Sequence, residues 1–323
     1  MPRRLLSGNG QHGDAEHWGN DMNKIAASVC AAGLLVALAA APANAEDQKT
    51  IAIIVPTLKI AVLQVESKAA VDMAEKLGYK AIVLTHDFNT ASELKDADQI
   101  ITQKVAGVVW NVADPAASAV AVKKVRDAGI PVVNMDRTLT QPKIADDSIE
   151  SDNFQCGALA AQAFINMVGT TGSYAEIRGP SSDAMGRTRS AGYHSVLDKT
   201  GLKMVAQDSA AYDQTKGFQL AGSILQGHPD ILGFVTGNDS IGLGAAAAIK
   251  AQGKQKIVVV GIDGGVDAVQ AINSGTSAFR ASAAQPVAAQ GEQGVVVIDK
   301  IIKGDKDAIT DGRVQRIPCT LTK

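Results

Sequence analysis

The sequence predicts an α/β protein in which two lobes, each a doubly wound parallel sheet, are joined by a hinge. From residue 50 onward, short apolar runs alternate with segments in which apolar residues recur at helical spacing, a pattern typical of βα units. Runs such as residues 257–260 are apolar throughout, as in strands that are buried on both faces. The length of 323 residues, 46% of them hydrophobic, suffices for two lobes that each have a core.

The first lobe is predicted from four strands and three helices. The apolar runs that match strands are residues 51–55, 81–84, 105–110 and 131–135. The segments with helical spacing between them are residues 63–77, 90–103 and 115–128. Val71, Ala74 and Leu77 lie on one face of the first of these helices, as a helix that covers a sheet requires. Gly78 and Gly129 follow two of the helices, where a glycine C-cap is expected.

The second lobe repeats the alternation after a loop. The predicted helices are residues 154–168, 189–199, 214–226, 240–252, 266–274 and 290–303. The predicted strands are residues 174–177, 203–207, 231–236, 256–262 and 278–283. We therefore expect an N-terminal lobe over 46–150, a C-terminal lobe over 151–310 and a hinge-crossing segment over 311–323. The expected hinge strands lie near 111–112, 149–153 and 315–321.

The first 45 residues precede this pattern and have the features of an export signal. A short positive region begins at Met22, residues 25–41 carry no charge, and an Ala-x-Ala signal-peptidase motif ends at Ala45. We expect cleavage after Ala45, location in the periplasm, and Met22 as the true start. An N-terminal membrane anchor is the alternative, although the apolar run is barely long enough to span a bilayer.

Composition and motifs exclude several classes of protein. The chain has 31 Lys and Arg against 33 Asp and Glu, and this net charge of −2 gives no excess of positive charge for binding nucleic acid. Three cysteines are too few for a disulfide scaffold. Outside the leader only Cys156 and Cys319 remain; an oxidising compartment permits a bond between them, but two buried free thiols are the favoured interpretation. His86, His194 and His228 lack metal-ligand spacing, so we expect no metal and no cofactor.

Polar side chains follow the predicted strands of both lobes. In open α/β sheets, ligands bind beyond the carboxyl ends of the strands, so these side chains are candidates for a site between the lobes. The candidates are Asn111, Asp136, Arg137, Arg189, Asn238, Asp263 and Gln285. Their guanidinium, carboxylate and amide groups together suit a neutral, hydroxyl-rich ligand. The alternative is that these side chains only cap helices and form hydrogen bonds to the backbone of loops.

Several stretches carry a resemblance to a known family. They are "TIAIIVPTL", "GIPVVNMDR", "SDNFQCGALAA", "MGRTRSAGYH", "VTGNDSIGLGA" and "VVVGIDG". In this order they resemble the ribose-binding group of type 1 periplasmic binding proteins, from Thr50 to the C-terminus. The resemblance implies a monomeric receptor, not an enzyme, that closes its hinge on a neutral sugar or small polyol and delivers it to an ABC permease in the inner membrane. A chemoreceptor is the alternative partner.

The resemblance also implies which residues bind the ligand. By motif they are Asp136, Arg137, Arg189, Asn238, Asp263 and Gln285. Tyr212 matches an aromatic of the second lobe, but Ile60, Val62 and Leu63 stand where the family commonly has Asn and two aromatics that stack on the sugar. Without these two aromatic rings to stack on a sugar ring, a tetritol, pentitol or pentose is favoured over a hexose as the ligand. Trp110 would compensate only if its side chain reached the cleft, and a core position is equally consistent with the sequence.

Three rival functions have weaker support in the sequence. Residues 242–247 resemble a dinucleotide-binding fingerprint, but the glycines are expected inside a helix. Asp136 and Asp263 could form a carboxylate pair for glycoside hydrolysis, but Arg137 would keep Asp136 ionised and unable to donate a proton. A sugar-responsive transcription factor would carry a basic helix-turn-helix where this chain has its leader.

Overall fold

The computed structural model describes residues 48–254 and 256–323. The predicted leader, its cleavage after Ala45, the start at Met22 and the alternative of a membrane anchor lie outside these residues. Among the helices that the structure describes, none combines the length and apolarity needed to cross a bilayer.

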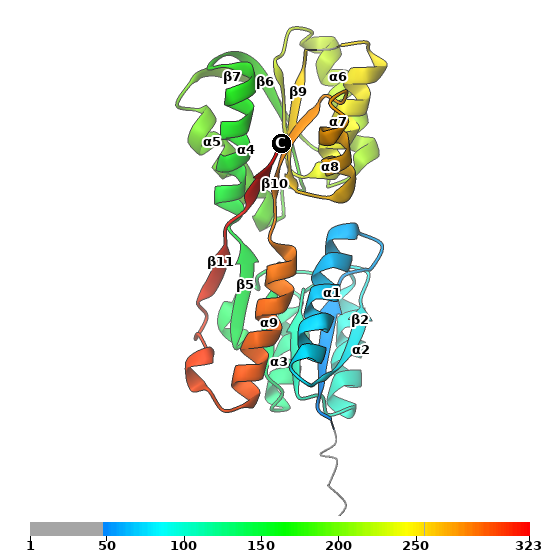
Figure 1. Ribbon diagram of the computed structural model, residues 1–323, viewed down its shortest axis with the longest axis vertical. Coiled ribbons are helices and arrows are strands. Elements are labelled where there is room, and N and C mark those ends of the chain that lie inside the picture. The colour runs from blue at the N-terminus through cyan, green and yellow to red at the C-terminus, as the bar shows by residue number, and fades with distance from the viewer. Residues whose placement is uncertain (1–47, 255) are drawn as a thin grey trace, which may run out of the picture. The chain divides into compact units, whose positions relative to one another are not determined.

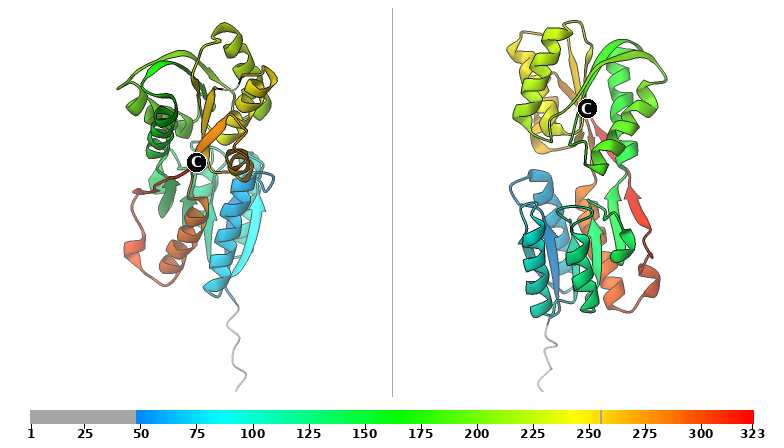
Figure 2. Two further views of the ribbon diagram at one scale, coloured as in Figure 1. Left: turned by 45° about the horizontal axis from the view of Figure 1, so that its top comes forward. Right: turned by 180° about the vertical axis from the view of Figure 1, so that it is seen from behind.

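The first lobe is built on a parallel sheet with the strand order β11-β5-β4-β3-β1-β2. Its strands are β1 (Thr50–Val55), β2 (Lys80–Thr85), β3 (Gly107–Trp110), β4 (Val132–Met135), β5 (Asp147–Ser151) and β11 (Val314–Ile317). Its helices are α1 (Ala61–Lys76), α2 (Thr90–Thr102), α3 (Ala119–Asp127) and α9 (Val287–Ile302). Figures 1 and 2 show α1 and α9 on one face of this sheet and α2 and α3 on the other.

Strand β1 shows why the apolar runs are continuous. Ile51 and Ile53 pack in the core beneath α1 and α9, whereas Ala52 and Ile54 pack in the core beneath α2 and α3. Both faces of the strand are therefore buried, as the absence of polar alternation predicts.

The second lobe has the strand order β12-β10-β9-β8-β6-β7, in which only β12 runs antiparallel to its neighbour. Its strands are β6 (Thr171–Arg178), β7 (Gly201–Ser209), β8 (Gly233–Thr236), β9 (Val258–Asp263), β10 (Phe279–Ala284) and β12 (Thr320–Thr322). Its helices are α4 (Asn153–Val168), α5 (Ala184–Leu197), α6 (Gln214–Gly227), α7 (Asp239–Ala251) and α8 (Val266–Asn273). The pair α4 and α5 covers one face, and α6, α7 and α8 cover the other. The predicted class of two doubly wound sheets is confirmed.

Helix α9 differs from the expected arrangement. The expected C-terminal lobe, 151–310, included this helix, but the structure packs it on α1 and on strands β3, β4 and β5 of the first lobe. Gly291 allows this close approach, because a Cβ atom there would lie 2.4 Å from the backbone oxygen of Glu66. The prediction was wrong because α9 belongs to the first lobe by packing and to the second half of the chain by sequence only.

The chain crosses between the lobes at three places in the described residues. These are the β5–α4, β10–α9 and β11–β12 connections, at residues 151–153, 284–287 and 317–320. The expected crossing at 111–112 is wrong, because β3 continues into α3 and β4 of the same lobe. Gln285 and Pro286 form the crossing that replaces it.

Cys156 of α4 and Cys319 form a disulfide with a Cα–Cα distance of 5.2 Å. The favoured interpretation of two free thiols is therefore wrong. The side chain of Gln155 holds the same segment, because its Oε1 accepts from the Cys319 backbone nitrogen at 2.9 Å. The disulfide thus fixes the last crossing segment to the second lobe.

The glycines of residues 242–247 lie inside α7, as expected. A Cβ atom at Gly244 would lie 2.1 Å from the backbone oxygen of Gln214 in α6. These glycines therefore pack two helices together and form no phosphate-binding turn.

Candidate functional site

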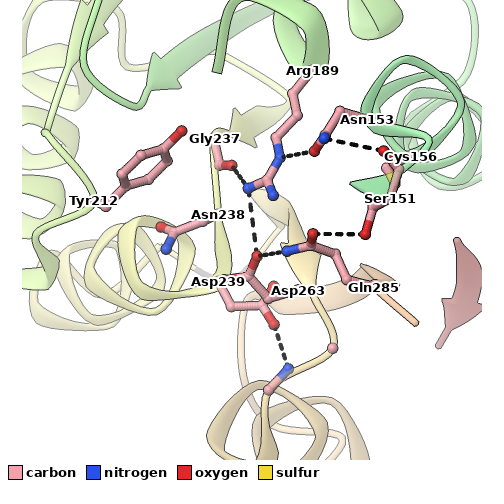
Figure 3. Close-up of polar contacts among 12 residues, drawn as sticks. Ser151, Asn153, Cys156, Arg189, Tyr212, Gly237, Asn238, Asp239, Asp263 and Gln285 are labelled. Atoms are coloured by element: carbon pink, nitrogen blue, oxygen red, sulfur yellow. Dashed lines mark hydrogen bonds and ion pairs between the residues drawn. The ribbon is translucent and has the colours of Figure 1, made fainter. Parts of the chain in front are cut away.

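Arg189 is the centre of a polar cluster in the second lobe (Figure 3). It lies on α5, whose first turn is capped by the side chain of Asp183, and only 4% of its surface is exposed. Its Nε donates to Asn153 Oδ1 at 2.8 Å, and its Nη1 donates to the backbone oxygen of Gly237 at 3.0 Å. The same Nη1 lies 3.4 Å from Asp263 Oδ1. Burial alone would lower the pKa of Arg189, but the charge of Asp263 raises it, so the buried group remains a cation.

Asp263 and Gln285 connect this cluster to the first lobe. Asp263 ends β9 with a φ of 136°, a strained conformation for a residue with a side chain. Its Oδ1 accepts from Gln285 Nε2 at 2.7 Å, and Gln285 Oε1 accepts from Ser151 Oγ at 2.9 Å. Ser151 in turn accepts from Gln290 Nε2 at 2.7 Å. Burial raises the pKa of Asp263, while Arg189 and the amides beside it oppose this rise.

Asn238 has the capping role that was weighed from the sequence. Its Oδ1 accepts from the Ile241 backbone nitrogen at 3.0 Å, so it is the N-cap of α7. The proximity of its side chain also lowers the pKa of Asp263 and thereby favours the ionised carboxylate.

The neighbouring Asp239 follows the same strand in the sequence but was not predicted as a site residue. It accepts from Ser282 Oγ at 2.6 Å and from the Gly265 backbone nitrogen at 2.8 Å, and it thereby supports the loop that carries Asp263. Burial, followed by the charge of Asp263, raises the pKa of Asp239 to about 7. The sequence signal was present in the Asn-Asp pair, but the sequence alone does not show which loop the aspartate supports.

A second polar cluster lies at the carboxyl ends of the first-lobe strands. Asn111 is fully buried, and its Nδ2 donates to Glu66 Oε2 at 2.9 Å and to Asp136 Oδ2 at 3.1 Å. Asp136 follows β4 with a φ of 59°. Glu66, on α1, was not predicted; its only sequence signal is an acid three residues after Leu63 on an otherwise apolar helix face.

The two clusters act on each other electrostatically. The charge of Asp136 contributes to the raised pKa of both Arg189 and Asp263 in the second lobe.

Tyr212 and Ile60 line a cavity of about 580 Å³ with residues of both lobes. The Tyr212 hydroxyl donates to Asp183 Oδ2 at 2.5 Å, and burial raises the pKa of Tyr212. Arg137 also lines this cavity; its Nη1 donates to the Ala113 backbone oxygen at 2.9 Å.

An aromatic of the first lobe also reaches this cavity. Phe88, in the loop after β2, lies 5.5 Å from the guanidinium carbon of Arg137 and lines the cavity. The expectation that the first lobe lacks a flat face is therefore wrong, since the ring comes from a different loop from the one that bears Ile60. Nothing in the local sequence around Phe88 distinguishes it from an ordinary loop residue.

The other apolar residues that were considered for the ligand site, Val62, Leu63 and Trp110, lie in different surroundings. Val62 lines a second cavity of about 350 Å³ together with Asp263 and Gln285. Leu63 is buried on the inner face of α1. Trp110 is fully buried in the core, where its Nε1 donates to Glu93 Oε1 at 3.1 Å, so the core interpretation of this residue holds.

No group of three or more His, Cys, Asp or Glu side chains is arranged to hold a metal ion within residues 48–254 and 256–323. The described part of the chain thus holds buried donors and acceptors in both lobes, and apolar or aromatic side chains share one cavity with Arg137 and another with Asp263 and Gln285. Such an arrangement can bind hydroxyl groups from two sides.

Comparisons with known proteins agree with this geometry. The model of the periplasmic binding protein domain family matches residues 51–306. A D-apiose import binding protein of Actinobacillus succinogenes is 35% identical over 83% of this chain and 86% of its own length. A ribose import binding protein of Escherichia coli is 32% identical over 88% of this chain and 95% of its own length.

A solved structure shares the fold. It is an ABC transporter periplasmic solute binding protein from Actinobacillus succinogenes with bound D-allose; it has a TM-score of 0.79 at 22% identity and covers 85% of this chain and 98% of its own. With the family match over residues 51–306 and relatives above 30% identity, the chain belongs to the periplasmic binding protein domain family.

Proposed function

We propose that this protein is a monomeric periplasmic receptor that binds one neutral sugar or small polyol and delivers it to an ABC permease of the inner membrane. The observation that carries the proposal is the pair of polar clusters around Asn111 with Asp136 and around Arg189 with Asp263. Each lobe contributes one carboxylate and one guanidinium, Asp136 and Arg137 from the first and Asp263 and Arg189 from the second, and the second-lobe pair lies 3.4 Å apart. A site with such balanced charge suits an uncharged ligand whose hydroxyls both donate and accept.

Closure of the hinge is the proposed mechanism. A ligand that hydrogen-bonds both clusters stabilises the form in which they are closest and shifts the population of the two lobes toward it. The three crossing segments are the hinge, and the Asp263–Gln285–Ser151 hydrogen bonds run along two of them. A wrong ligand leaves a buried polar group unpaired, at a cost of about 1–3 kcal/mol. The site should therefore discriminate strongly between sugars that differ in the configuration of one hydroxyl.

For the ligand, we propose a pentose, tetritol or pentitol in preference to a hexose. Of Ile60, Val62 and Leu63, only Ile60 lines the larger cavity, and it offers no aromatic face; Phe88 provides a first-lobe ring there. The relatives named for D-apiose and ribose agree with a five-carbon sugar. The ligand leaves the protein chemically unaltered; the relatives are named as binding proteins.

Export follows from the leader, which we propose is removed after Ala45 to release the mature receptor into the periplasm. The N-terminal sequence of the protein recovered from a periplasmic extract tests this directly. A chain that begins at Glu46 agrees with the proposal, and a chain that retains residues 25–41 in the membrane fraction contradicts it.

A thermal-shift panel followed by calorimetry tests the ligand class. Because a ligand stabilises the form that binds it, D-apiose, D-ribose, erythritol or a pentitol should raise the melting temperature of the mature chain. Strong stabilisation by glucose or galactose, without any effect of the smaller compounds, would contradict the preference for small ligands. No stabilisation by any sugar or polyol would contradict the proposed function itself.

A further inference from the structure

Glu66 is a buried acid whose burial the fold does not otherwise explain. It lies on the inner face of α1, where its buried neighbours are Leu63, Ser67, Ala70 and Ala74. Among the described residues Glu66 takes part in no ion pair, and its Oε1 is buried without a hydrogen-bond partner. Burying a carboxyl group without a contacting cation costs free energy. A role in the adjacent site would explain why the acid is present here.

The only hydrogen-bond partner of its side chain in the described residues is the Asn111 amide. Asn111 Nδ2 has two hydrogens, and it donates one to Glu66 Oε2 at 2.9 Å and one to Asp136 Oδ2 at 3.1 Å. The Asn111 backbone is fixed as well, since its nitrogen donates to Ile54 at 2.8 Å and its oxygen lies 2.9 Å from His86 Nε2. The bonds to Glu66 and Asp136 together therefore orient the amide and fix where Asn111 Oδ1, buried and unpartnered, points.

We propose that Glu66 is a positioning residue of the sugar site, which orients the Asn111 amide and, through it, the Asp136 carboxylate. This inference rests on the proposed function, since it assigns a further residue to the same site. Without Glu66, Nδ2 loses one of its two acceptors, and the bond to Asp136 alone orients the amide, so the amide and the carboxylate are held less firmly.

The charge state of Glu66 agrees with this role. Burial raises the pKa of Glu66 well above its ordinary value, and the charge of Asp136 raises it further, while Asn111 and Arg137 oppose the rise. A neutral acid accepts from Nδ2 and does not place a second negative charge beside Asp136. Glutamine has the same shape and the same acceptor, so Glu66→Gln keeps the interaction and Glu66→Met removes it.

The test is a double-mutant cycle on sugar affinity, measured by calorimetry with D-apiose and D-ribose as probes. We expect Glu66→Met to weaken binding about tenfold or more, and Glu66→Gln to remain within about threefold of the wild type. In an Asn111→Ala background, Glu66→Met should add less than about threefold, because its effect is transmitted through the missing amide. Asp146→Asn is the matched control, a buried acid of the same lobe paired with Arg126 away from the site, and it should bind as the wild type does.

Circular dichroism and melting temperature without sugar establish that each variant is folded; if Glu66→Met does not fold, Glu66→Ala takes its place in the cycle. Wild-type affinity in the folded apolar variant, a tenfold loss in Glu66→Gln, or strictly additive effects in the cycle would each overturn the inference. If the wild-type chain binds neither sugar, the proposed function fails and the inference falls with it. If the wild type binds and the cycle shows no coupling, only the inference falls.

Discussion

Replacing Arg189 with alanine should weaken sugar binding without unfolding the protein. The guanidinium is buried and donates to Asn153 Oδ1 and the Gly237 backbone oxygen, and it lies 3.4 Å from Asp263. Its removal leaves Asp263 with no ion-pair partner among the described residues and removes a charged donor from the ligand. A hydrogen bond to a charged group contributes about 1.5–3 kcal/mol, which corresponds to a rise in Kd of roughly tenfold to 150-fold.

Calorimetry with D-apiose and D-ribose measures this change, and circular dichroism checks that the variant is folded. Arg280→Ala is the control, because Arg280 is an arginine of the same lobe whose Nη1 donates to the Gly275 backbone oxygen away from the site. The matching first-lobe variant is Asp136→Ala, for which a loss of about tenfold or more is expected. Unchanged affinity in both Arg189→Ala and Asp136→Ala would refute the reasoning and return these residues to a capping role.

Further predictions concern stability. Replacing Cys156 and Cys319 with serine should lower the free energy of unfolding by about 2–4 kcal/mol in a denaturant titration; an unchanged midpoint would contradict the structural role of the disulfide. Because burial keeps Asp239 protonated up to about pH 7, the folded state binds more protons than the unfolded state between the ordinary pKa of 3.8 and about 7, so stability should fall as pH rises through this window. Asp239→Asn should flatten that slope, and an unaltered slope would show that Asp239 is ionised throughout. For His194, burial lowers the pKa, but Asp198 and Glu176 raise it by more, so the net pKa lies above the ordinary histidine value. The contribution of His194 to the stability of the fold should therefore be present below the ordinary histidine pKa and be lost as pH rises through the raised pKa. Chemical denaturation of wild type and His194→Gln across this range checks the last point; parallel curves would exclude the contribution.

Much of the fold follows from local pattern, and the exceptions have identifiable causes. Strand β5, Asp147–Ser151, is polar and lacks an apolar run, and the sequence marks its end only as a hinge segment. It is buried because partners far away in the chain satisfy it: Thr310 Oγ1 donates to Asp147 Oδ1 at 2.7 Å. Helix α5 begins five residues before its predicted start at Arg189, at Ala184, because Asp183 caps it. The position of α9 depends on packing between distant segments, which periodicity does not encode.

The residues of the candidate site also divide into those that the sequence predicts and those that it does not. Residues that follow strands, such as Asp136, Asp263 and Gln285, could be predicted because the end of a parallel strand is visible in the sequence. Glu66 and Phe88 could not, since one belongs to a helix face and the other to a loop that only the tertiary fold brings to the site.

A crystal structure of the mature chain with D-apiose or D-ribose would decide whether one sugar is held by both lobes. The proposal predicts a single intact sugar whose hydroxyls contact Asp136 from the first lobe and Arg189 and Asp263 from the second. A sugar held by one lobe alone, or bound away from all three side chains, would contradict it.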